Sequence, residues 1–201
     1  MKLVVVGHAR HGKDTVANML HLWGGLPAES SSWIAAERFV YAALTAEGYK
    51  YKSLQACWES RVTKEMRTKW YNLIVEFNKD DPTRLMKLIF EKNDIYVGLR
   101  NRDEFLAGKL ERLFDLSIWI DASERLPEES GDSMTLSKQD ADIIIDNNGT
   151  LTDLHHKVYA LARVLNLLNH PPGACCNEET GVQRPTSSGH GEDEWFGLRP
   201  S

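Results

Sequence analysis

The sequence predicts an α/β fold in three layers, with a mainly parallel sheet and helices on both faces. Over residues 1–168, short aliphatic runs of the length of buried strands alternate with longer segments of helical periodicity. Parallel strands are joined by crossover connections, which are usually helices that cover both faces of the sheet. The chain has 201 residues, which allows one domain or one domain with a tail.

The N-terminal part opens with a predicted strand at residues 3–6, where four aliphatic residues end at Gly7. A helix is predicted next at 12–23, because apolar residues repeat there at helical spacing and two glycines follow. Three more helices are predicted before the next strand, at 33–47, 61–78 and 83–92.

The C-terminal part alternates strands and helices in the same way. Strands are predicted at 94–99, 116–120 and 142–146, and helices at 102–114 and 150–168. Residues 123–139 are polar and lack a regular period. We interpret this segment as a mobile lid that excludes water from a ligand site.

The composition changes near residue 169. Residues 169–201 hold four of the seven prolines and five of the fourteen glycines, and their apolar content is thin. Such a segment cannot bury enough apolar surface to offset the entropy of ordering it. The sequence therefore predicts a domain at 1–168 followed by a disordered C-terminal tail at 169–201.

Composition and charge exclude several classes of protein. Hydrophobic residues make up 42% and charged residues 26%, which is typical of a globular chain. The net charge of −5 disfavours a general nucleic-acid coat, which would carry a basic excess. No apolar stretch approaches the roughly 20 residues of a membrane span, and the three cysteines form no disulfide framework. We expect a reduced, cytoplasmic protein that does not bind membranes.

The strongest chemical signal lies between the first strand and the first helix. Two glycines five residues apart are followed at once by a lysine, which is the spacing of a phosphate-binding loop. In such a loop the backbone amides and the positive end of the helix surround phosphate oxygens, and the lysine reaches the transferring phosphates. The predicted nucleotide-binding residues are Gly7, His8, Ala9, Arg10, His11, Gly12, Lys13, Asp14 and Thr15.

The loop departs from the usual pattern at the position that normally holds magnesium. The residue after Lys13 is Asp14, where serine or threonine is usual, and the hydroxyl comes one position later at Thr15. Either side chain could order Mg²⁺, and the sequence alone does not decide between them.

GxxxxGKDT near the N-terminus resembles the phage P-loop nucleotide kinases related to thymidylate kinase. This group includes deoxynucleoside monophosphate kinases and the 5-hydroxymethyluracil DNA kinases of phages with hypermodified thymine. The resemblance extends from residue 1 to about residue 160, and its other stretches are 31–38, 94–100, 118–123 and 142–149. Only the phosphate loop is a specific motif.

The resemblance implies a P-loop kinase fold and ATP-dependent phosphoryl transfer with Mg²⁺. The acceptor it favours is the hydroxymethyl group of 5-hydroxymethyl-deoxyuridine in phage DNA. The alternative acceptor is a free deoxynucleoside monophosphate. If the chain is phage-encoded, its compartment is the host cytoplasm. A third hypothesis is a regulatory protein that binds ATP and has lost the transfer activity.

Charged residues after the later strands fit the rest of such a site. Arg100 and Arg102 follow the strand at 94–99, at the edge where open α/β sheets bind ligands. We expect Arg100 and Arg125 to stabilise the transferring phosphoryl group, and Arg102 and Glu104 to bind the acceptor. For Arg100 the alternative is a surface ion pair with a neighbouring acid, and for Arg125 an ordinary surface arginine.

The region of residues 30–71 supplies the remaining candidates. Glu37 is the candidate base for an attacking hydroxyl, and Arg38 could hold an acceptor phosphate, although both also suit a solvated helix face. Aromatic and basic residues interleave over 49–71, which favours a polymer acceptor. Within it, Trp58 and Arg61 are the candidate acceptor contacts.

The strand at 94–99 lacks the internal aspartate that often supplies a second magnesium carboxylate. Metal binding could then depend on Asp14, Glu104 or Asp121. Asp121 could equally cap the segment that follows it. The missing carboxylate is the feature that keeps the regulatory hypothesis open.

Overall fold

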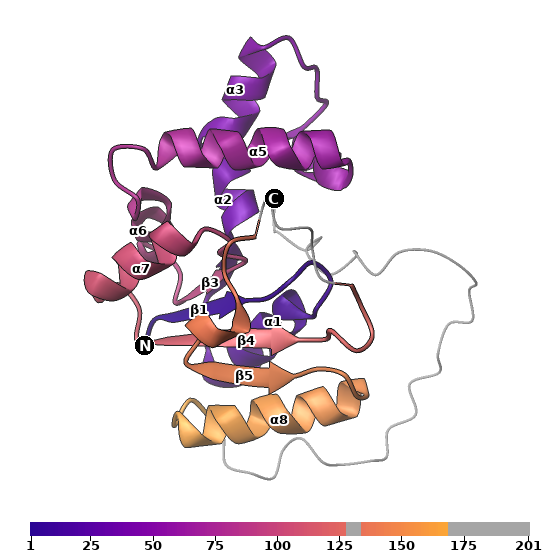
Figure 1. Ribbon diagram of the computed structural model, residues 1–201, viewed down its shortest axis with the longest axis vertical. Coiled ribbons are helices and arrows are strands. Elements are labelled where there is room, and N and C mark those ends of the chain that lie inside the picture. The colour runs from indigo at the N-terminus through magenta and orange to yellow at the C-terminus, as the bar shows by residue number, and fades with distance from the viewer. Residues whose placement is uncertain (128–133, 169–201) are drawn as a thin grey trace, which may run out of the picture. The chain divides into compact units, whose positions relative to one another are not determined.

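The computed structural model describes residues 1–127 and 134–168, and these contain one five-stranded sheet whose strand pairs are all parallel (Figure 1). The strand order is β2-β3-β1-β4-β5. The strands are β1 (Leu3–Val6), β2 (Ala28–Ser30), β3 (Ile95–Val97), β4 (Leu116–Asp121) and β5 (Ile143–Asp146). The predicted α/β fold is therefore confirmed. The predicted tail, 169–201, lies outside the described residues.

Helices connect the strands and cover the sheet. The α-helices are α1 (Lys13–Gly24), α2 (Ser31–Ala35), α3 (Tyr41–Ala46), α4 (Leu54–Glu59), α5 (Lys64–Phe77), α6 (Arg84–Phe90), α7 (Arg102–Leu110) and α8 (Leu151–Val164). A π-helical segment, Ala36–Val40, joins α2 to α3, so the predicted helix at 33–47 is a helical run of three parts. Short 3₁₀ segments lie at Ser60–Val62 and Lys138–Asp140.

The two faces of the sheet pack against different helices because side chains alternate along a strand. Leu3 and Val5 belong to the core cluster formed with α1 and α8, whereas Val4 and Val6 belong to the cluster formed with α6 and α7. All four side chains are buried, with at most 1% of their surface exposed. The continuous aliphatic run of β1 is thus a strand covered on both faces.

A third core cluster lies among the helices α2 to α5. Its buried members include Ala36, Val40, Leu44, Cys57 and Trp70. Figure 1 shows α3 and α5 grouped together, apart from the sheet. This helical group follows β2 and precedes β3, so both of its ends lead back to neighbouring strands.

The structure contains two elements that the sequence did not predict, and several predicted elements differ in where they begin or end. The strand β2 and the helix α4 were not predicted. The helix predicted to begin at residue 61 begins at Lys64, because the Thr63 hydroxyl accepts a hydrogen bond from the Met66 amide at 3.2 Å and caps the helix there. No helix among the described residues is long and apolar enough to cross a membrane.

Candidate nucleotide-binding site

Parallel strands all end at the same edge of their sheet, and the phosphate loop lies at that edge. The loop follows β1, the central strand, whose neighbours are β3 and β4. Val5 pairs with Val97 of β3 and with Ile118 of β4, so the segments after these two strands lie beside the loop. The fold therefore brings residues 7–12, 98–101 and 121–125 to one edge.

The loop conformation requires its glycines. Gly7 has φ +144°, and a Cβ at that position would lie 2.5 Å from the Ile120 carbonyl oxygen of β4. Gly12 has φ +93°, and its Cβ would lie 2.6 Å from Nδ2 of Asn147. Between them Arg10 is exposed and has φ +65°, a left-handed conformation that non-glycine residues rarely adopt. The loop thus packs closely against β4 and against the segment after β5.

The loop ends in the first turn of α1, and the start of that helix has no side-chain cap. Gly12 is the N-cap residue and has no side chain to accept from the amides of the first turn. The Lys13 side chain folds back over the loop, and its Nζ donates to the His8 carbonyl at 2.7 Å. Only 8% of Lys13 is exposed. Uncapped amides beside a lysine form an anion-binding arrangement.

His11 connects the loop to β4, a role that the sequence did not reveal. Its ring is fully buried, and Nδ1 accepts a hydrogen bond from the Ala122 amide at 3.1 Å. Within the described residues, Nε2 has no hydrogen-bond partner. Burial lowers the pKa of His11, and the nearby His8 lowers it further. The imidazole is therefore held neutral, with its proton on Nε2.

Asn147 connects the loop to β5 in a similar way. Its Nδ2 donates to the His11 carbonyl at 2.9 Å, and its backbone amide donates to the Asp121 carbonyl at 2.6 Å. Its own carbonyl accepts two hydrogen bonds from Arg125, from Nε at 2.9 Å and from Nη2 at 2.6 Å. Arg125 is therefore held beside the loop by the β5–α8 connection. Part of the predicted lid, residues 128–133, lies outside the described residues.

Of the candidate magnesium ligands, Glu104 lies in a pocket beside β3, and the others occupy two different places. Asp14 and Thr15 lie on the first turn of α1 and are exposed. Asp121 ends β4, where its Oδ1 accepts from the Ser123 amide at 3.0 Å and its Oδ2 pairs with Lys138 at 3.3 Å. Burial acts to raise the pKa of Asp121, but these hydrogen bonds outweigh it and hold the pKa below its usual value. Asp121 thus caps the turn that follows it.

The two arginines after β3 have different surroundings. Arg100 lines a pocket beside β3, and its carbonyl accepts from the Thr135 amide at 3.0 Å. Arg102 begins α7, is more than half exposed, and pairs through Nε with Asp140 at 2.9 Å. The Thr135 hydroxyl also accepts from the Arg102 amide at 2.8 Å. The last part of the predicted lid, at Thr135, and Asp140 just after it are therefore fastened to the segment that follows β3.

Glu104, a predicted acceptor contact, is buried beside β3. It has 3% of its surface exposed, and its Oε1 accepts from the Tyr96 hydroxyl at 3.0 Å. Oε2 accepts from Nδ2 of Asn78 at 3.3 Å. Burial raises the pKa of Glu104 to about 8, and the hydrogen bond from Tyr96 only partly opposes this rise. The side chain is therefore mostly uncharged at neutral pH.

Glu37 and Arg38 lie in the π-helical segment and are exposed. They contact each other, with Arg38 Nε 3.8 Å from a Glu37 carboxylate oxygen. Exposed pairs of this kind contribute little to stability. Glu37 lies further along the helical run than Ser31, which is at the sheet edge. At a rise of about 1.5 Å per residue, the two are about 9 Å apart along the helix axis.

Trp58 and Arg61 are engaged with each other and with α2. The guanidinium of Arg61 lies 4.1 Å from the ring centre of Trp58. Both side chains donate to the Ser32 hydroxyl, Arg61 at 2.6 Å and Trp58 at 3.2 Å. These predicted acceptor contacts thus fasten α4 and the 3₁₀ segment that follows it to the start of α2, beside the end of β2.

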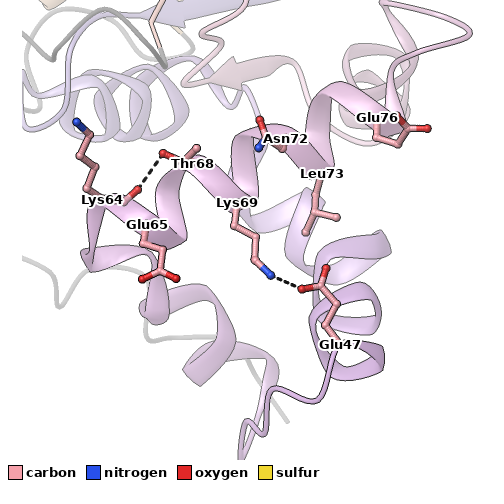
Figure 2. A pocket seen from close by; sticks show the side chains of 8 residues that line it. All are labelled: Glu47, Lys64, Glu65, Thr68, Lys69, Asn72, Leu73 and Glu76. Carbon is pink, nitrogen blue, oxygen red and sulfur yellow. Dashed lines mark hydrogen bonds and ion pairs between the residues drawn. The ribbon is translucent and has the colours of Figure 1, made fainter.

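A larger and shallower hollow of about 820 Å³ runs along α5 (Figure 2). Figure 2 shows Lys69 of α5 pairing with Glu47 at the end of α3. The lining also includes Lys64, Glu65 and Glu76, so both signs of charge alternate along it. None of its lining residues belongs to the phosphate loop or to a strand.

Comparison with known proteins gives structural similarity alone. No protein-family model matches the chain, and no curated protein is similar to it in sequence. Similar solved structures include shikimate kinase from Aquifex aeolicus, with 14% identity, a TM-score of 0.45, and 83% of this chain and 99% of that chain covered. Dephospho-CoA kinase from Campylobacter jejuni has 16% identity, a TM-score of 0.44 and coverages of 82% and 98%. A gluconokinase from Sinorhizobium meliloti has 13% identity, a TM-score of 0.39 and coverages of 84% and 97%. All three TM-scores are below 0.5, and these similarities carry no weight for activity.

Proposed function

We propose that the chain is an ATP-dependent phosphotransferase that acts on a nucleotide-type acceptor. The observation that carries this proposal is the phosphate loop itself. Two glycines without room for a Cβ, an uncapped helix start and Lys13 meet at the carboxyl edge of a parallel sheet. A turn without a ligand would have no need of this combination.

The loop residues fit the triphosphate of ATP. Backbone amides at the start of α1 would donate to phosphate oxygens, and Lys13 would exchange the His8 carbonyl for a phosphate oxygen. Mg²⁺ needs few protein ligands when phosphates and water supply the others. Asp14, the carboxylate of the first turn of α1, and Thr15 are placed to hold it. Bound Mg²⁺ would neutralise charge on the phosphates.

Transfer requires an acceptor oxygen in line with the γ-phosphorus. The new bond joins that oxygen to phosphorus, the bond from phosphorus to the β–γ bridging oxygen breaks, and ADP leaves with the electron pair. Arg100 and Arg125 lie at the edge beside the loop and would stabilise the charge on the transferring group. A hydroxyl acceptor would also lose a proton, and Glu37 is the candidate base.

Two acceptors are consistent with this site. The pocket beside β3 measures about 190 Å³ and is lined by residues of α5, α6 and α7, and its small size favours a small acceptor such as a free deoxynucleoside monophosphate. A base in duplex DNA would first have to leave the stack to enter it. The exposed cations Lys52, Lys64 and Arg67 are the observation that supports 5-hydroxymethyluracil in DNA as the second candidate.

The test is transfer of label from [γ-³²P]ATP to each acceptor in parallel, with Mg²⁺ present. One arm holds the four common deoxynucleoside monophosphates and the other holds duplex DNA containing 5-hydroxymethyluracil. We expect label on a monophosphate and a loss of at least about 100-fold in Lys13→Ala, because a preorganised cation at the transferring phosphates is removed. Lys92→Ala, at an exposed lysine after α6, is the matched control.

The other possible outcomes would change either the acceptor or the activity that we propose. Label on the DNA alone would establish the second acceptor and exclude the first. ATP binding without label on any acceptor would contradict phosphoryl transfer and favour an ATP-dependent regulatory protein.

A further inference from the structure

Glu104, Tyr96 and Asn78 form a buried polar cluster in the pocket beside β3. The three side chains come from α7, β3 and the end of α5, and all of them line the pocket. Asn78 is fixed in orientation because its Oδ1 accepts from the Leu85 amide at 3.1 Å, which leaves Nδ2 as the donor to Glu104. Each carboxyl oxygen of Glu104 thus accepts one hydrogen bond and keeps capacity for one more.

The pocket has the size and lining of a site for one planar ring. Its volume of about 190 Å³ is below the roughly 300–1,000 Å³ of sites for drug-sized ligands, so it suits part of a nucleotide. Apolar side chains of α5 and α6 form its walls, and Tyr71 adds an aromatic face. Gly98, with φ +86°, and Ser31 close it on the side of the sheet edge.

The pocket lies at the end of β3, and the phosphate loop follows the neighbouring strand β1. Gly98 follows β3 directly, and its amide donates to the Val5 carbonyl of β1 at 2.9 Å. Neighbouring strands lie about 4.8 Å apart. Arg100, which also lines the pocket, follows Gly98 by two residues. A ligand with its ring in the pocket would have an anionic group near Arg100 and the loop.

We propose that this pocket binds the nucleobase of the acceptor, and that the Glu104 carboxyl pairs with a base edge carrying adjacent N–H and C=O groups. This inference rests on the proposed function, because it names the part of the nucleotide acceptor that the site selects. The base N–H would donate to the Glu104 oxygen that also accepts from Tyr96. The other oxygen, carrying the proton, would donate to the base carbonyl while accepting from Asn78.

The uncharged form of Glu104 supplies the donor in this arrangement. Because burial raises the pKa of Glu104 to about 8, the carboxyl keeps its proton at neutral pH and loses it above about pH 8. The other ionisable or charged groups that line the pocket are Tyr71, Lys79, Tyr96, Arg100 and Asp103. Base binding should therefore weaken as the pH rises above 8.

The experiment measures dissociation constants by calorimetry for dTMP, its N3-methyl derivative and 2-deoxyribose 5-phosphate between pH 6.5 and 9. For the wild type we expect dTMP to bind at least tenfold more tightly than either other probe at pH 7. That advantage should fall steadily above pH 8. The sugar phosphate corrects for ionisation of the phosphate and of the cations.

Three variants identify the group responsible. Glu104→Gln keeps a donor and an acceptor but cannot ionise, so the decline in dTMP affinity above pH 8 should disappear. Glu104→Ala should lower dTMP affinity at least tenfold while ATP affinity stays within twofold, which also shows that the variant is folded. Glu91→Gln, an exposed carboxylate after α6, should behave as the wild type.

The failures of the two proposals are distinguishable. If ATP binds and the Glu104 variants bind dTMP as the wild type does, the nucleobase pocket is wrong and the phosphotransferase proposal stands. The same holds if the decline above pH 8 persists in Glu104→Gln, or if ATP binds and dTMP does not. If the wild type does not bind ATP, the proposed function itself is contradicted.

Discussion

His11 lies inside the phosphate loop, and its two hydrogen bonds reach far along the chain. The ring accepts from Ala122, 111 residues away, and the backbone carbonyl accepts from Asn147, 136 residues away. No spacing rule connects residues at such separations, so the sequence could place His11 in the loop but could not reveal its partners. The spacing of Gly7, Gly12 and Lys13 was readable because those residues are neighbours.

Protonation of His11 should weaken the fold. Its pKa is lowered in the folded chain, mainly by burial, from a usual value of 6.5. The unfolded chain therefore binds the proton more readily, and the stability that the neutral ring provides is lost as the pH falls below about 7. We expect the free energy of unfolding, from urea titrations, to fall between pH 7 and 5.

His11→Asn should reduce the fall in the free energy of unfolding between pH 7 and 5. Oδ1 of asparagine can still accept from the Ala122 amide, but the asparagine side chain does not titrate. His11→Ala should cost about 1–3 kcal/mol at pH 7, since the buried amide loses its partner. His156→Asn, at an exposed histidine of α8, controls for loss of an imidazole. If the free energy of unfolding falls equally with pH in the wild type and in His11→Asn, His11 does not govern this pH dependence.

Asp14 replaces the usual hydroxyl residue of the loop, and its carboxylate should be the main protein ligand of Mg²⁺. Removal of Mg²⁺ with a chelator should abolish phosphoryl transfer. Asp14→Asn should raise the Mg²⁺ concentration for half-maximal turnover at least about tenfold. Thr15→Val should have the smaller effect. The reverse order, measured by magnesium titration at saturating ATP, would assign the metal to Thr15.

At the scale of elements, the well-predicted parts are those whose residues carry a long or regular signal. The strand β1 and the helix α1 were predicted because an aliphatic run and a helical period meet at two glycines. The strand β2 was missed because it has three residues, Ala28–Ser30, all only half-buried. The helix α4 was missed because six residues show less than two turns of a period.

The fit of the loop against β4 can be tested with glycine substitutions. Gly7→Ala would place a Cβ 2.5 Å from the Ile120 carbonyl oxygen and also hold a strained positive φ. Gly48 has φ +95°, and a Cβ added there would have no neighbouring atom within 4 Å, so Gly48→Ala tests the strain alone. We expect Gly48→Ala to cost about 1–2 kcal/mol and to leave ATP affinity unchanged.

Gly7→Ala should destabilise the fold more than Gly48→Ala and lower ATP affinity at least tenfold, because either the loop or β4 must move. The measurements are urea unfolding and ATP calorimetry on both variants. Equal ATP affinity in the two variants would show that close packing of the loop against β4 is not required for binding.

At the scale of the whole molecule, the site divides into two parts that differ in how far the sequence reveals them. The phosphate loop is contiguous, residues 7–15, and carries its own spacing signal. The pocket beside β3 joins Asn78, Tyr96 and Glu104 from three parts of the chain, and only the fold brings them together. Trp58 and Arg61 stood out in the sequence, and the structure shows their contacts with each other and with Ser32.

The proposed function depends on the binding of the ATP phosphates by residues 7–15. This binding is tested most directly by titrating ¹⁵N-labelled protein with ATP and Mg²⁺ and following backbone amide chemical shifts. We expect saturable shifts concentrated at the amides of residues 8–15, with smaller shifts at Ala122 and Asn147, and we expect these shifts to be lost in Lys13→Ala. Shifts concentrated elsewhere, or no saturable shifts at millimolar ATP, would contradict it.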